Sequence, residues 1–112
     1  MDFNINRQEK ATVITLKGSL LADLQTKDIL QHVTDSIQDN HSNFVVDLSE
    51  LKFINSSGLG MLLTALTKAR KAGGDVLLAN VPEQVSNLLV ITKLNNIFQA
   101  KDSVQDAIAS FK

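Results

Sequence analysis

The sequence predicts an α/β fold: one domain in which a mixed sheet of four to five strands is packed with four helices. Short apolar runs alternate along the chain with segments whose apolar residues recur at helical spacing. This alternation is typical of a mostly parallel sheet with right-handed crossovers. The first two expected strands are only three residues apart, which predicts an antiparallel hairpin at the start of the sheet. A length of 112 residues fits one core, so we expect residues 1–112 to form a single domain.

The first third of the chain supplies the hairpin and the first helix. Polar and apolar residues alternate over residues 2–7, as in a half-exposed strand, and residues 11–17 form a second strand rich in Val, Ile and Thr. We expect Gly18 to end that second strand. Residues 23–38 predict a helix, whose apolar face consists of Ile29, Leu30, Val33 and Ile37.

The middle of the chain predicts a buried strand, a loop and a strongly apolar helix. The run Phe44-Val45-Val46, continued by Asp47 and Leu48, indicates a strand covered on both faces. A loop after this strand should open the helix, and Gly73-Gly74 should stop it. The apolar stripe of the helix consists of Leu59, Leu62, Leu63, Leu66 and Ala69.

The last third predicts two strands and two short helices. Residues 76–79 form a buried strand, and Pro82 fits the first turn of the helix after it. Ile97 and Phe98 are expected to form a brief last strand. The two helices take their inward faces from separate sets of residues: Val85, Leu88, Leu89 and Thr92 in the first, and Val104, Ile108 and Phe111 in the second.

Composition excludes several classes of function. The formal net charge is -1, from 11 basic and 12 acidic residues, so the chain lacks the basic footprint of a nucleic-acid-binding protein. The absence of cysteine excludes disulfides, thiolate metal sites and thiol nucleophiles. No segment approaches the roughly 20 apolar residues of a membrane span, and residues 1–10 lack the apolar stretch of a secretory signal. We therefore expect a soluble, cytoplasmic protein that neither binds nucleic acid nor inserts into a membrane.

Candidate catalytic and metal-binding groups are sparse. His32 and His41 are the only histidines, and neither has other ligands at the spacing that a zinc site requires. Gly58-Leu59-Gly60 lacks the lysine and the longer glycine spacing of a phosphate-binding loop. We therefore expect no catalytic residue, no metal and no cofactor, which makes an enzyme or a nucleotide-binding protein the less favoured interpretation.

The junction before the apolar helix is the most informative segment. Asn55, Ser56 and Ser57 are all residues that cap helices, and the unpaired N–H groups of a first helical turn favour negative charge. Two interpretations follow: the serines merely cap the helix, or one hydroxyl accepts a phosphate that the fold tolerates while a partner surface changes. Gly58 and Gly60 permit either tight packing inside the fold or the close approach of another protein.

Residues 47–60 resemble the signature of STAS domains, the family of bacterial anti-sigma-factor antagonists. The shared pattern is an apolar strand ending near Asp-Leu-Ser, a spacer, and then Phe-(apolar)-Asp-Ser-Ser/Thr-Gly-Leu-Gly, which here reads Phe53-Ile54-Asn55-Ser56-Ser57-Gly58-Leu59-Gly60. The order of elements and Asn80-Val81-Pro82 also fit, so the resemblance spans nearly the whole chain.

The resemblance implies a phosphorylation switch. It assigns the phosphate to Ser56 and the capping role to Ser57. The unphosphorylated protein would bind an anti-sigma factor that is also a serine kinase of the histidine-kinase-like ATPase type, and so release a sigma factor. Phosphorylation of Ser56 would switch this binding off, and a metal-dependent serine phosphatase would reset it. The expected partner-binding residues around the loop are Asn55, Ser57, Gly58, Leu59, Gly60, Met61 and Asp23.

Two positions depart from the family pattern. Asn55 replaces the usual Asp before the phosphoserine. An acidic residue often follows the glycine after the second strand by two or three positions, but Leu20 and Leu21 stand there, and Asp23 is the nearest acid. Both departures affect the choice of partner more than the fold.

Two alternatives remain at this stage. The chain could be a constitutive STAS scaffold, such as a subunit of a lipid-transporting ABC system or part of a signalling assembly, with Ser56 never phosphorylated. Separately, Met61 and Ala65 lie beside the main apolar stripe of their helix. They form either an exposed docking patch or, as we prefer, a surface buried by the neighbouring helix.

Overall fold

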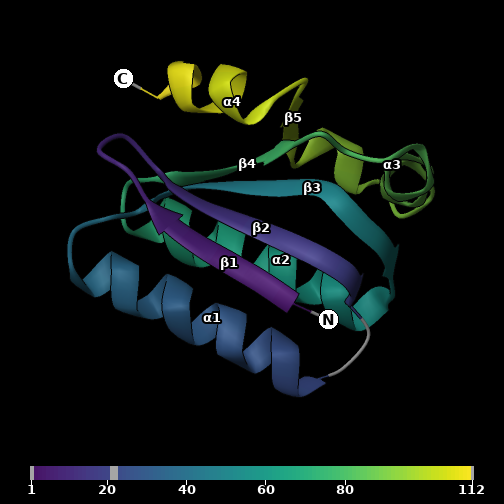
Figure 1. The fold of residues 1–112 in the computed structure, drawn as a ribbon, viewed down its shortest axis with the longest axis horizontal. Helices are drawn as coiled ribbons and strands as arrows, with labels where there is room; N and C mark the ends of the chain where they lie inside the picture. The colour runs from purple at the N-terminus through teal and green to yellow at the C-terminus, as the bar shows by residue number, and fades with distance from the viewer. Residues whose placement is uncertain (1, 21–22, 112) are drawn as a thin grey trace.

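The chain forms a sheet packed between helices, in the predicted order of elements (Figure 1). The computed structural model describes residues 2–20 and 23–111. The elements are β1 (Asp2–Arg7), β2 (Thr12–Leu20), α1 (Asp23–Gln38), β3 (Asn43–Ile54), α2 (Ser56–Lys71), β4 (Asp75–Ala79), α3 (Glu83–Ile91), the 3-10 helix η1 (Leu94–Asn96), β5 (Gln99–Lys101) and α4 (Val104–Ser110).

The five strands lie in sequence order, β1-β2-β3-β4-β5. β1 and β2 pair antiparallel, and every later neighbour pairs parallel, which confirms the predicted mixed sheet. The register aligns Val13, Val45 and Leu77 across the three central strands. Because side chains alternate between the two faces of a strand, these three share one face, and the residues that follow each of them share the other.

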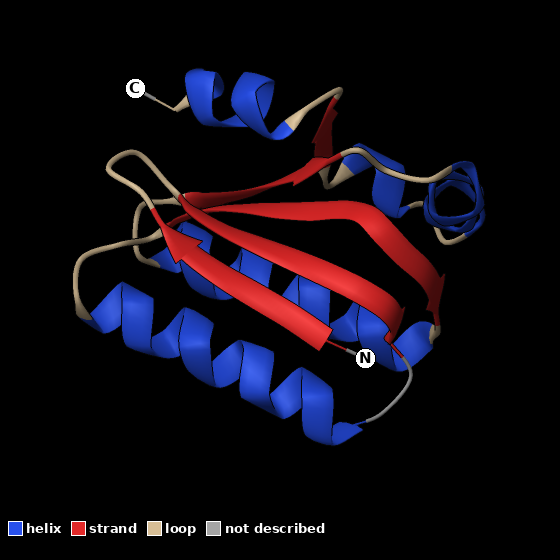
Figure 2. Ribbon diagram, viewed as in Figure 1, coloured by secondary structure: helices blue, strands red, loops and turns tan. Residues whose placement is uncertain are grey.

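Helices cover both faces of the sheet (Figure 2). α1 and α2 lie side by side along one face, and the larger core there also includes α3 residues such as Val85 and Leu89. α4 lies on the opposite face, where Ala107 and Phe111 pack with Val45 and Leu77 in a smaller core. Burial on both faces explains the continuous apolar runs of β3 and β4.

β2 and β3 are longer than predicted. β2 continues through Gly18 to Leu20, so the expectation that Gly18 ends the strand is wrong. Gly18 has a φ of 78°, and the pairing of β2 with β3 shifts register immediately after it and again between Thr15 and Lys17. At each shift β3 supplies one more residue than β2, so local bulges let the two strands stay paired to Leu20 and Ile54.

The last third of the chain needs three corrections. Pro82 is the N-cap of α3, with an extended ψ of 152°, and does not lie in its first turn. Ile97 and Phe98 are not a strand, because both backbone N–H groups donate to the Leu94 carbonyl and close the turn after η1. β5 follows them. Thr92 is exposed at the end of α3, where its hydroxyl donates to the Leu88 carbonyl.

Candidate functional site

The end of β3 leads directly into α2, with one residue between them. Figure 1 shows β3 curving at its carboxyl end toward the first turn of α2. The expectation that the strand gives way to a loop after Leu48 is therefore wrong, because residues 49–54 belong to the bulged strand. Bulges re-aim a strand and often lie beside functional sites, and here they direct Ile54 to the edge where the helix begins.

Asn55 caps α2. Its backbone is extended, with φ −108° and ψ −175°, and its side-chain Oδ1 accepts a hydrogen bond from the Gly58 N–H at 3.0 Å. Its carbonyl accepts the first helical bond, from the Leu59 N–H at 3.0 Å. The assignment of the cap to Ser57 is therefore wrong: the helix begins two residues earlier than a Ser57 cap allows, so both serines lie in its first turn.

Ser56 is the first residue of α2. Side chains of Ser56 and Ser57 fall outside the described part of the structure, but their backbone is helical. The first turn of α2 carries no acidic residue, whereas Lys68, Arg70 and Lys71 occupy its last turn. The positive end of the helix dipole at Ser56 is thus not neutralised from within the helix, and added negative charge there is electrostatically favourable.

The residues after Ser57 divide between core and surface. Leu59 is 4% exposed and Met61 is 3% exposed, and both belong to the larger core that α1 and α2 share. The interpretation that the neighbouring helix buries Met61 is confirmed, so neither side chain offers a surface to a partner. Gly60 is exposed, and a Cβ built on it would meet no atom within 4 Å.

The start of α1 lies at the same edge of the sheet as Asn55. Leu20, the last residue of β2, is the register partner of Ile54. Asp23 opens α1 three residues later, while Leu21 lies outside the described residues. The structure thus brings the segment of Asp23 and the cap of α2 to one edge, although they are far apart in sequence.

Phe53 is a surface residue that the sequence interpretation did not single out. It is 61% exposed, the second highest value among the large apolar side chains described as exposed. It borders a hollow of about 160 Å³ with Ile54 and, from α3, Gln84, Val85 and Leu88. An exposed aromatic two residues before the cap adds apolar contact area beside Ser56, as protein-binding surfaces have. The signal in the sequence that could have identified Phe53 is its position three residues before Ser56 in the Phe-Ile-Asn-Ser run.

Other kinds of site were searched for in the described ranges, 2–20 and 23–111. No three His, Asp or Glu side chains gather there as metal ligands. None of the described helices is long and apolar enough to cross a membrane.

Comparison with known proteins decides the family. The model of the STAS domain matches residues 2–107. The chain belongs to the STAS domain family. An anti-sigma F factor antagonist of Paenibacillus polymyxa is 25% identical over 114 residues, which cover 100% of this STAS domain and 97% of that protein.

Solved STAS structures agree with the fold. The anti-sigma factor antagonist SpoIIAA in its unphosphorylated form has a TM-score of 0.77 at 19% identity. The match covers 97% of this chain and 96% of the SpoIIAA chain. An anti-sigma factor antagonist from Mycobacterium paratuberculosis has a TM-score of 0.82 at 19% identity. The match covers 98% of this chain and 92% of the Mycobacterium chain. At such identities the likeness establishes the fold: a five-stranded mixed sheet with four helices.

Proposed function

We propose that this STAS domain is an anti-sigma-factor antagonist and that phosphorylation of Ser56 switches its binding off. The observation that carries the proposal is the position of Ser56, at the first residue of a helix that Asn55 caps. That position lies at the sheet edge where β2 and β3 also end. The names of the relatives support the first half of the proposal. The second half is supported by a structural neighbour, the Bacillus cell fate determinant SpoIIAA, solved in a phosphorylated form with a TM-score of 0.78.

The physical basis of the switch is a change of charge that the fold tolerates. A phosphate adds about −1.5 to −2 charges and three strong acceptor oxygens. At the first residue of α2 it faces the positive end of the helix dipole, and the first turn contains no carboxylate to repel it. The fold therefore persists while the surface seen by a partner gains negative charge.

The surface proposed to meet the partner includes exposed and half-buried residues around Ser56. Gly60 and Phe53 are exposed and Asn55 is half-buried, so an aromatic ring, a polar cap and a helical position without a side chain flank Ser56 along the chain. The start of α1, at Asp23, borders the same edge. Such a mixture of apolar and polar groups suits a reversible protein–protein contact.

The catalytic groups of the cycle belong to the partners. The anti-sigma factor would be a serine kinase of the histidine-kinase-like ATPase type that transfers the γ-phosphate of ATP to the Ser56 hydroxyl. A metal-dependent serine phosphatase would hydrolyse the phosphoester and restore the binding form. This chain supplies only the acceptor hydroxyl, so we assign it no enzymatic activity of its own.

The direct test compares forms of the protein for binding to the anti-sigma factor of the same organism. The unmodified protein and Ser56→Ala should bind, whereas Ser56→Asp and phosphorylated Ser56 should bind at least about tenfold more weakly. Far-UV circular dichroism of all forms should be the same, because the phosphate acts on the surface and not on the fold. Equal affinity of all four forms would overturn the proposal.

A further inference from the structure

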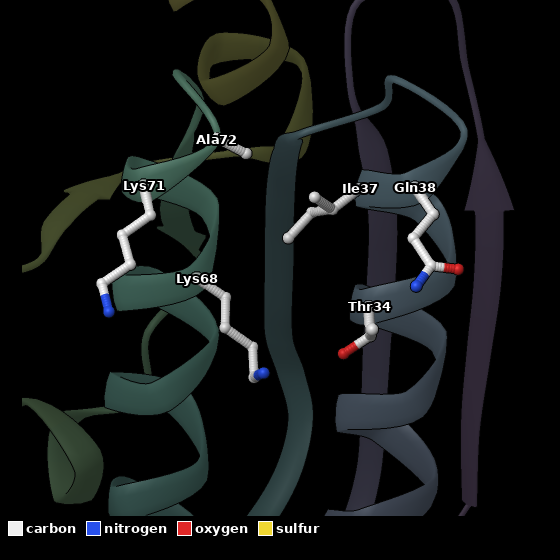
Figure 3. Close-up of a pocket in the computed structure, with 6 residues that line it drawn as sticks. All are labelled: Thr34, Ile37, Gln38, Lys68, Lys71 and Ala72. Carbon is white, nitrogen blue, oxygen red and sulfur yellow. The ribbon is translucent and has the colours of Figure 1, made fainter.

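A groove runs between the last turns of α1 and α2, at the end of α2 opposite to Ser56. Its volume is about 350 Å³, within the range of small-molecule sites. Figure 3 shows the residues that line it: Thr34, Ile37 and Gln38 from α1, and Lys68, Lys71 and Ala72 from α2 and its C-cap. None of the six is acidic, and three of them end in a nitrogen that donates hydrogen bonds.

The wall of the groove is apolar in its middle. The Ile37 side chain points from α1 toward α2, and Ala72 lies across from it (Figure 3). Ile37 is half-buried and packs against the larger core, so its position is fixed. The methylene stem of Lys68 extends the apolar surface, because long basic side chains cover apolar groups with their stems.

Thr34 differs from the other described threonines of the helices. The hydroxyls of Thr64, Thr67 and Thr92 each donate to the carbonyl four residues earlier, at 2.8 to 2.9 Å. Within the described residues Thr34 forms no such bond. Figure 3 shows its hydroxyl and the Lys68 ammonium turned toward one another from opposite sides of the groove. A cation and a hydroxyl with no described hydrogen bond thus face the same part of the groove.

The positive charge of the groove is not neutralised by the fold. The described ion pairs join Arg7 to Asp39, Lys17 to Glu50 and Arg70 to Asp75, and they leave out Lys68 and Lys71. On α1, the Asp35 carboxylate accepts from the Gln31 amide.

Capping α2 does not require these lysine side chains either. Its last carbonyls accept hydrogen bonds from the backbone N–H groups of residues 72–74. The negative ends of the α1 and α2 dipoles, each equivalent to about half a charge, offset only part of the charge of the two lysines. An anion that enters the groove would therefore meet a site of unbalanced positive charge.

We infer that this groove binds a medium-chain aliphatic carboxylate. One carboxylate oxygen would accept from the Lys68 ammonium and the other from the Thr34 hydroxyl, while the alkyl chain packs on Ile37 and Ala72. Hydrogen bonds between ionised groups are stronger than neutral ones, and each methylene of the chain that packs on the apolar wall adds to the affinity. Binding thus requires both the negative charge of the carboxylate and the alkyl chain of the ligand.

This inference is independent of the phosphorylation switch. Residues 68–72 are 12 to 16 residues from Ser56 in the sequence, which along a helix corresponds to roughly 20 Å. Binding in the groove needs neither the anti-sigma factor nor a phosphate on Ser56. The two proposals can therefore fail separately.

The test is a titration of the purified protein followed by ¹H–¹⁵N NMR. Decanoate, below its micellar concentration, should produce saturable shifts of the amides of residues 34–38 and 68–72. Acetate carries the charge without the chain, and decylammonium carries the chain with the opposite charge. Both should bind at least about tenfold more weakly than decanoate.

Variants of the protein distinguish binding in the groove from a general attraction of the anion to surface charge. Lys68→Gln and Thr34→Val should each raise the Kd for decanoate, Lys68→Gln by about tenfold or more. The matched controls Lys10→Gln and Thr64→Val, which change exposed residues outside the groove, should leave the Kd within about twofold. The inference is overturned if decanoate produces no saturable shift at millimolar concentration, if decylammonium binds equally well, or if Lys68→Gln binds like the wild type.

Discussion

At the scale of single residues, Asn55 links the fold to the proposed switch. Its Oδ1 accepts the Gly58 N–H, so it performs the capping that an Asp performs, without a negative charge. A phosphate on Ser56 would therefore adjoin a neutral amide and not a carboxylate. The residue types alone predicted that one of three neighbours caps α2. Selecting Asn55 required the backbone, because all three are good caps and only their φ and ψ values distinguish them.

Removal of the cap should be measurable as a loss of stability. Asn55→Ala should lower the free energy of unfolding by about 1 kcal/mol, since the Gly58 N–H loses its acceptor. Asn55→Asp keeps an acceptor and adds a charge that suits the dipole, so it should unfold at the wild-type urea concentration or above it. Ser57→Ala is the matched control and should change the free energy of unfolding little. A larger loss for Ser57→Ala than for Asn55→Ala would return the cap to Ser57.

At the scale of elements, the helices were easier to predict than the strand ends. The periodic apolar face of α1 predicted a helix over residues 23–38, and the helix in the structure has the same bounds. β2 and β3 run further than predicted because bulges maintain their pairing past polar residues such as Ser49 and Glu50. Parallel bulges leave no periodic mark in a sequence, so an interruption of the apolar run was interpreted as a loop.

The two ends of α2 predict opposite responses to alanine. Gly60→Ala places a methyl group in open space within a helix, so it should raise the free energy of unfolding by about 0.5–1 kcal/mol. If the partner approaches Gly60 closely, the same change should weaken binding of the anti-sigma factor.

Gly74 serves as the contrast in the same measurement. A Cβ there would overlap the Ser42 backbone carbonyl, and the backbone cannot yield as a flexible side chain can. Gly74→Ala should therefore destabilise the protein by about 1–3 kcal/mol or more. Urea denaturation of both variants tests this, and a stabilised Gly74→Ala protein would contradict the packing of the α2–β4 turn.

At the scale of the whole molecule, the helix-covered sheet holds the proposed binding residues together at one of its edges. Helices cover both faces of the sheet, and the carboxyl ends of β2 and β3 bring Asn55, Ser56 and the start of α1 together. Sequence alone predicted this class of fold, and through the family signature it selected Ser56 as the residue of the proposed switch. It could not show that Phe53 is exposed, because this depends on how α3 packs against β3.

The most direct measurement is phosphopeptide mass spectrometry of the native protein from cells in several growth conditions. The peptide that spans residues 53–60 must be covered well enough to assign a phosphate to Ser56 or to Ser57. We predict phosphate on Ser56, in a fraction that rises and falls with conditions. No phosphate on Ser56 in any condition would contradict the switch and favour a constitutive scaffold in which Ser56 only begins the helix.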